Sequence, residues 1–156
     1  MKVTESKTRF NSLFWLFIAL TCLNFNTVKG AAVWTSAANG AWNTGATWTL
    51  VSGTPAQVYP TAADLVTITT HSISVGVSSQ CAGLTIAASG TLAIVGGQSF
   101  VCQGNFTNSG TLKTTGTAVV YFLATATVPA PSINQAGTMV GTFVLTFRPY
   151  GRTINV

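Results

Sequence analysis

The chain has 156 residues, of which 47% are hydrophobic and only 6% are charged, with a formal net charge of +5 at pH 7. A nucleic-acid surface needs clustered Lys and Arg, and residues 31–156 contain no such cluster. Paired carboxylates for glycoside cleavage are also excluded, because residues 31–156 contain one Asp and no Glu. The regular apolar residues and aromatics supply enough surface to bury, which argues against disorder.

Residues 1–30 have the three parts of a secretory signal peptide. Three basic residues stand in the first nine positions, an apolar run covers residues 13–23, and Val28 and Gly30 occupy the −3 and −1 positions before Ala31. The apolar run is shorter than the ~20 residues of a comfortable membrane span. We therefore expect cleavage after Gly30, export, and no membrane span in the mature chain.

Removal of this leader changes the charge of the protein. The leader carries four of the seven Lys and Arg and one of the two acidic residues, which leaves a net charge of +2. Four charges in the whole of residues 31–156 is far below the roughly one-quarter that is usual for soluble domains. We expect that other subunits cover part of this weakly charged surface, because isolated molecules usually rely on net charge for solubility.

Three tryptophans, Trp34, Trp42 and Trp48, follow the leader and precede the first regular repeat. Aromatic rings of this kind could stack on sugars, as in a carbohydrate-binding module. A β-helix also needs a cover over its exposed hydrophobic end, and we favour this capping role for the three rings.

Short alternating segments follow, and none is typical of a long amphipathic helix. Apolar residues alternate with Thr, Ser and Gly, which places each apolar set on one face of a strand. Gly-rich and Asn-rich turn signals separate the segments. The alternating apolar sets are Val66 and Ile68; Ile73, Val75 and Val77; Leu84 and Ile86; Leu92 and Ile94; and Phe143, Leu145 and Phe147.

Two nearly equal spacings indicate how these strands are arranged. Cys81 and Cys102 form one pair, and the phrase Gly-Thr-Leu recurs at 90–92 and 110–112. Both separations are roughly 20 residues, which fits a β-solenoid whose coils repeat at this period and lie ~4.8 Å apart. Positions one coil apart then become neighbours, so we expect a disulfide between Cys81 and Cys102.

The fold that we predict is all-β: a small β-solenoid, or parallel β-helix, of about 20 residues per coil. Residues 31–156 would form a single solenoid domain of about six coils. The alternative is a β-sandwich of the immunoglobulin type. Such a sandwich normally has a longer separation between its cysteines, with a Trp between them, and no Trp lies between Cys81 and Cys102.

Residues 34–115 carry a recurrent pattern of Trp, Pro, Asp and Gly-Asn phrases. It resembles β-helical modules in secreted surface proteins of Bacteroidota-type bacteria, similar in style to the eight-glycine β-helix domain. The resemblance implies a right-handed β-helix used in adhesion or surface architecture. The pattern consists of Trp34, Asn39-Gly40-Ala41-Trp42, Trp48, residues 60–68 from Pro60 to Ile68, Leu84-Thr85-Ile86, Gly90-Thr91-Leu92 and residues 104–112 from Gly104 to Leu112.

This chain has few residues that could support catalysis or bind a metal ion. Ser72, His71 and Asp64 could in principle form a triad, but no nucleophile elbow accompanies them. We expect Asp64 to order the turn after Pro60 through backbone N–H groups, and His71 to lie at a coil corner. One His, one Asp and two oxidised cysteines cannot build a zinc site. We therefore expect no enzymatic activity and no cofactor.

Two functions remain. The first is a secreted structural protein that associates with copies of itself in an extracellular filament, sheath or matrix, because solenoid ends are open hydrogen-bonding edges. The alternative is a cell-surface adhesive or carbohydrate-binding module with glycans as partners, using the Trp and Tyr side chains.

We expect the terminal segments, Ala31–Ser36 and Phe143–Val156, to supply the contact between subunits. Phe143, Leu145 and Phe147 form one apolar face that could dock while the backbone extends a sheet. The other interpretation is that residues 143–147 are simply the last coil of the same subunit.

Overall fold

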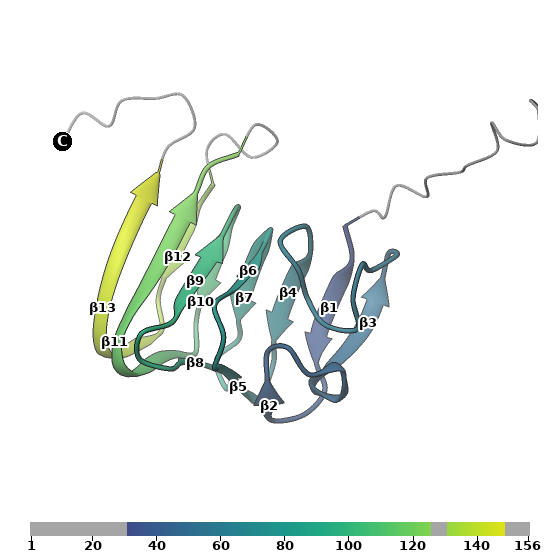
Figure 1. The fold of residues 1–156 in the computed structure, drawn as a ribbon, viewed down its shortest axis with the longest axis horizontal. Helices are drawn as coiled ribbons and strands as arrows, with labels where there is room; N and C mark the ends of the chain where they lie inside the picture. Colours follow the sequence, from purple (N-terminus) through teal and green to yellow (C-terminus); the bar gives the residue numbers. More distant parts are fainter. Residues whose placement is uncertain (1–30, 126–130, 149–156) are drawn as a thin grey trace, which may run out of the picture.

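The structure, a computed structural model, describes residues 31–125 and 131–148 (Figure 1). These residues form strands and one 3₁₀ helix. The elements are β1 (Val33–Ser36), β2 (Gly40–Ala41), η1 (Gly45–Thr47), β3 (Trp48–Ser52), β4 (Leu65–Ile68), β5 (Ser72–Val75), β6 (Ser79–Cys81), β7 (Gly83–Ile86), β8 (Thr91–Ile94), β9 (Ser99–Cys102), β10 (Phe106–Asn108), β11 (Thr111–Leu123), β12 (Ile133–Gln135) and β13 (Thr138–Arg148).

The strands stack as a β-solenoid with three faces, which confirms the predicted fold. The first face contains β1, β4, β7, β10 and β12. The second contains β2, β5, β8 and the first parts of β11 and β13, and the third contains β6, β9 and the second parts of β11 and β13. Among the described strand pairs only β1 and β3 are antiparallel, which excludes a β-sandwich.

The stack holds one incomplete and four complete coils, fewer than the six that we expected. The first coil leaves the stack after β2, and residues 43–64 form η1, β3 and the following loop instead of further turns. Coil length also increases along the chain. Among the complete coils, the step on the first face from Val66 to Leu84 is the shortest, that from Leu84 to Phe106 is longer, and that from Phe106 to Ile133 is the longest.

Apolar side chains from corresponding positions of successive coils form continuous rows inside the stack. The predicted alternation is correct for β4, β5, β7 and β8, whose apolar residues at alternate positions are buried. Val77 is the exception: it lies beyond the end of β5 and is 60% exposed. The main rows are Val66, Leu84 and Phe106; Ile73, Leu92 and Leu112; and Cys81, Cys102 and Phe122.

A row of glycines, Gly90, Gly110 and Gly137, marks the corner between the first and second faces. A Cβ atom on Gly110 would lie well inside 3.0 Å of the Ala87 carbonyl oxygen, and one on Gly137 would lie as close to the Gly110 carbonyl oxygen. No side chain fits at such a distance, so each coil can approach the previous one here only through glycine. The glycine of each recurrent Gly-Thr-Leu phrase lies at this corner.

Candidate functional site

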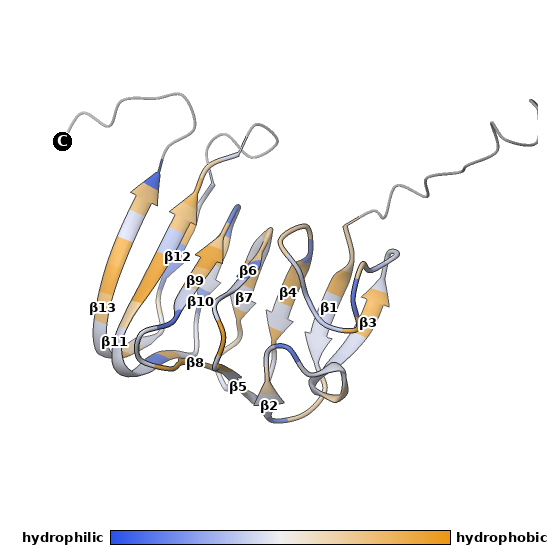
Figure 2. Ribbon diagram, in the orientation of Figure 1, coloured by the Kyte–Doolittle hydropathy of each residue, from blue (hydrophilic) through white to orange (hydrophobic). Residues whose placement is uncertain are grey.

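The C-terminal end of the described stack exposes the interior rows of the solenoid. Leu145 and Phe147 continue the rows of Val120 and Phe122, and no further described coil lies beyond them. Phe147 stacks on Phe122 with 5.3 Å between ring centroids, yet it remains 49% exposed. Figure 2 shows the hydrophobic bands along β11 and β13 at this end. The other members of this uncovered end are Ile133, Met139 and Phe143.

The same end carries free strand edges. β12 pairs only with β10, and β13 pairs only with β11, so both have one edge without a partner among the described strands. An edge as long as β13 is a template for pairing with another chain, and proteins usually protect such edges. We call this surface, made of β12, β13 and their inward side chains, the C-terminal end.

At the opposite end, β3 covers the first face of the stack. β3 lies antiparallel on β1, so both edges of β1 are occupied, by β3 and by β4. The predicted contact segment Ala31–Ser36 therefore has no free edge in β1. The other predicted segment divides in two: residues 143–148 belong to β13 of the same subunit, and residues 149–156 lie outside the described part of the chain.

The three tryptophans of the N-terminal end are buried, with exposures of 4% for Trp34, 2% for Trp42 and 6% for Trp48. The Trp42 Nε1–H donates to the Pro60 carbonyl at 3.1 Å, and the Trp48 Nε1–H donates to the Trp42 carbonyl at 2.7 Å. The Trp34 Nε1–H is buried without a partner. Rings buried in this way cannot stack on a sugar, and their packing is that of a cap.

Trp42 takes the place of a missing strand. The first coil has no strand on the third face, and the Trp42 ring contacts Phe100 from β9 edge to face, with 5.0 Å between centroids. Ser79 pairs with Phe100 in register, and its small side chain leaves room for this contact. The ring of Trp48 also contacts the Trp42 ring edge to face, with 5.0 Å between centroids.

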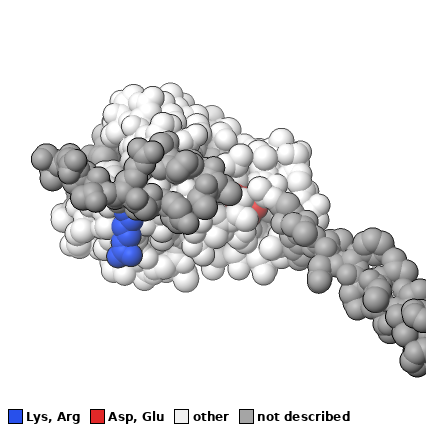
Figure 3. Space-filling model, turned by 90° about the horizontal axis from the view of Figure 1, so that it is seen from above, with Lys and Arg blue, Asp and Glu red and all other residues white. Residues whose placement is uncertain are grey.

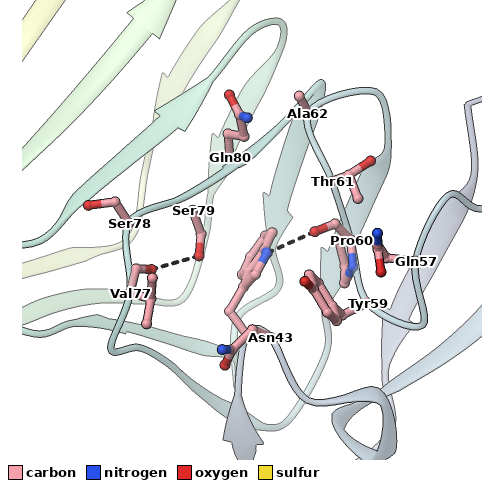
Figure 4. Close-up of a pocket in the computed structure, with 11 residues that line it drawn as sticks. Asn43, Gln57, Tyr59, Pro60, Thr61, Ala62, Val77, Ser78, Ser79 and Gln80 are labelled. Carbon is pink, nitrogen blue, oxygen red and sulfur yellow. Dashed lines mark hydrogen bonds between the residues drawn. The ribbon is translucent and has the colours of Figure 1, made fainter.

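A pocket of about 240 Å³ lies where this strand is missing, between the loop around Pro60 and the free edge of β6 (Figure 4). Its lining is uncharged and combines amides and hydroxyls with the half-buried ring of Tyr59. No sequence pattern predicts it, because the pocket depends on where the first coil leaves the stack. The lining residues are Trp42, Asn43, Gln57, Tyr59, Pro60, Thr61, Ala62, Val77, Ser78, Ser79 and Gln80.

Cys81 and Cys102 face each other in the parallel register of β6 and β9, as their spacing predicted. Both side chains are fully buried, and both are free thiols in the structure. Burial raises the pKa of the Cys81 thiol, whereas the hydrogen bond with Cys81 lowers the pKa of Cys102. The Cys102 Sγ also lies 3.5 Å from the carbonyl oxygens of Gly104 and Asn105.

We predict that these two thiols form a disulfide under oxidising conditions. In-register neighbours on adjacent parallel strands have Cα atoms ~4.8 Å apart, within the range that a disulfide requires. In the chain-entropy model a loop of this size contributes ~3 kcal/mol to stability. The intact mass of the denatured chain should rise by two hydrogens on reduction. Two thiols that react with an alkylating reagent before reduction would contradict the prediction.

The structure separates the residues of the hypothetical triad. Asp64 precedes β4 and His71 follows it, so a four-residue strand of roughly 13 Å lies between them. Asp64 is buried and accepts hydrogen bonds from the backbone N–H groups of Ala32 and Thr61, at 2.8 and 2.7 Å. This is the turn-ordering role that the sequence predicted.

His71 contacts Ser36, whereas the hypothetical triad used Ser72. The Oγ of Ser36 lies 2.9 Å from His71 Nδ1 and accepts the Thr69 backbone N–H at 3.0 Å. Ser36 is 5% exposed, so its hydroxyl links coils rather than facing a substrate.

Metal-binding clusters and membrane-spanning helices are both absent from the described residues. Residues 31–125 and 131–148 contain no group of three or more His, Cys, Asp or Glu side chains that could hold a metal ion. Nor does any helix in this part of the chain have the length and apolar character needed to cross a membrane.

Comparisons with known proteins give no relative of this chain. No protein-family model matches it, and searches of curated proteins and of solved structures found no significant similarity. The resemblance to eight-glycine-type modules therefore stays a prediction.

Proposed function

We propose that this protein is a secreted, non-enzymatic structural protein whose subunits associate with one another in an extracellular filament, sheath or matrix. The observation that carries the proposal is the C-terminal end, where strand edges and apolar rows have no further strand over them among the described residues. Burial of apolar surface stabilises an association by roughly 25 cal/mol per Å² before the entropic cost of binding. A solenoid end of this kind is suited to contact with another protein surface.

The electrostatics of the surface support the same proposal. Among the described residues only Asp64, Lys113 and Arg148 carry a full charge, and Asp64 is buried. In Figure 3 almost all of the described residues on the visible face are uncharged. Low net charge promotes association, because little repulsion opposes the approach of a second copy. The leader in residues 1–30 supports export to the cell surface or the extracellular space.

A carbohydrate-binding role is the second candidate, and the pocket in Figure 4 is the observation that favours it. Its amides, hydroxyls and Tyr59 ring are groups that bind neutral sugars, since they combine hydrogen bonding with an apolar face. The three tryptophans that suggested this role are buried, however, so Tyr59, which belongs to the same predicted set of Trp and Tyr side chains, is the candidate stacking ring at this pocket.

Native protein from the producing cells tests the structural role. We expect the mature chain in the extracellular or cell-surface fraction, and electron microscopy of that fraction should show regular assemblies that antibodies against the chain label. Retention inside the cell, or uniformly dispersed single molecules on the grid, would contradict the proposal.

A further inference from the structure

The two ends of the solenoid differ in shape, which limits how copies can associate. At the C-terminal end all three faces stop at the same level, with β12 on the first face and β13 on the second and third. The N-terminal end is stepped. Its third face starts at β6, in the second coil, whereas the first face continues through β1 to β3.

This step is incompatible with head-to-tail stacking. β1 and β3 extend the first face two strand positions beyond the coil that contains β6, or roughly 10 Å. A flat end that approached from this side would meet β3 before its β13 could reach the free edge of β6. The pocket loop and the Trp42 ring also occupy part of the space above β6.

We propose that the C-terminal end binds the same end of a second copy, forming a two-fold symmetric pair. This inference rests on the proposed self-association and adds the partner surface and its symmetry. A flat end with uncovered apolar rows and free edges requires a flat partner with the same features, and the C-terminal end itself meets this requirement. Such an isologous contact is closed, so it yields pairs, and any larger assembly needs a second contact elsewhere.

The register of the pair follows from β13. In this pair, a two-fold axis perpendicular to the solenoid axis passes through the middle of the third face. The third face of one copy then meets the third face of the second copy, and the first face of each copy meets the second face of the other. The edges then run antiparallel, as in an ordinary sheet. Centring the axis on Leu145 pairs the whole stretch Thr142–Arg148 with itself. Phe143 of one copy then lies opposite Phe147 of the second copy, and the half-exposed Phe147 ring becomes covered.

Charge favours this antiparallel register over a parallel one. Arg148 is the only charged residue of β12 and β13, and its guanidinium lies 5.7 Å from the Tyr121 ring centroid. In the antiparallel register each Arg148 lies opposite Thr142 of the second copy, so the two arginines are roughly 20 Å apart along the strand. That exceeds the Debye length of ~8 Å at physiological salt. A parallel register would place the two arginines side by side.

Cysteine cross-linking tests the symmetry. In the mature chain carrying Leu145→Cys, the new thiol of each copy lies on the two-fold axis, opposite the same thiol of the second copy. Mild oxidation should therefore give a covalent dimer in high yield. Val95→Cys is the matched control, since both residues are 41% exposed and Val95 lies on the side of the stack. It should remain monomeric on a non-reducing gel. Association without cross-linking through residue 145 would overturn the two-fold pair while leaving self-association intact.

A charge substitution tests the same contact without oxidation. Leu145→Lys places two like charges at the axis, and we expect its sedimentation to change from dimer to monomer while its β-sheet circular dichroism is retained. Val95→Lys should still form the dimer. If Leu145→Lys still forms the dimer, the proposed contact is wrong. If the unsubstituted chain is itself monomeric at every concentration, both the pair and the proposed self-association are wrong.

Discussion

Replacing Trp42 by alanine is expected to lower the free energy of unfolding by about 3–5 kcal/mol, the usual cost of truncating a large buried aromatic. The ring contacts both Trp48 and Phe100 at 5.0 Å, and its Nε1–H donates to the Pro60 carbonyl. Its loss leaves a cavity at the N-terminal end of the third face and an unpaired carbonyl in the cap. Urea denaturation followed by circular dichroism measures the change.

Trp42→Phe is the matched control, because it keeps an aromatic ring and removes the hydrogen-bond donor. We expect it to be less destabilising than Trp42→Ala. The same pair of variants separates the cap from a ligand platform. A Trp42→Ala protein with unchanged stability that no longer binds a neutral oligosaccharide would contradict capping and support the carbohydrate-binding role.

Replacing Gly110 by alanine is expected to cost about 3 kcal/mol or more, because the new methyl group overlaps backbone that cannot move independently. Its Cβ would lie well inside 3.0 Å of the carbonyl oxygens of both Ala87 and Gly90, in two neighbouring parts of the stack. The coils would have to separate at this corner, which weakens the hydrogen bonds on both adjoining faces. Thermal unfolding followed by circular dichroism measures the loss.

Gly76 provides the control for this substitution. It lies in a turn, a methyl group added to it would have no atom within 4 Å, and it does not have a positive φ. Gly76→Ala should therefore leave the melting temperature nearly unchanged or raise it slightly. Equal melting temperatures for Gly76→Ala and Gly110→Ala would show that the coils are not packed closely at the glycine corner.

The arrangement of coils could be predicted because the central part of the chain repeats at nearly constant spacing. Cys81 with Cys102, and the two Gly-Thr-Leu phrases, are paired in the structure as their separations indicated. The third copy of the corner glycine, Gly137, was not recognised. It follows Gly110 at a longer spacing than Gly110 follows Gly90, and the next two residues are Thr-Met rather than Thr-Leu.

The N-terminal cap was harder to predict from the sequence. β3 has one buried residue followed by four exposed ones, so it shows no alternation that would identify it as a strand. Its position depends on a contact with β1 that no local pattern indicates. The pocket beside β6 has the same origin, because it exists only where the first coil departs from the stack.

The apolar face of Phe143, Leu145 and Phe147 was visible in the sequence, whereas its exposure was not. The two interpretations, a last coil and a contact surface, are compatible in the structure. β13 pairs with β11 within the subunit, and Leu145 and Phe147 remain 41% and 49% exposed. A sequence pattern shows which side chains share a face, but what covers that face depends on the order of coils in space.

Sedimentation velocity of the purified protein over a wide range of concentrations tests the proposed self-association most directly. We expect a monomer at low concentration and conversion to a species of twice its mass as the concentration rises, because the C-terminal end becomes covered. A single sedimentation coefficient corresponding to the monomer over the whole range would contradict self-association through this end.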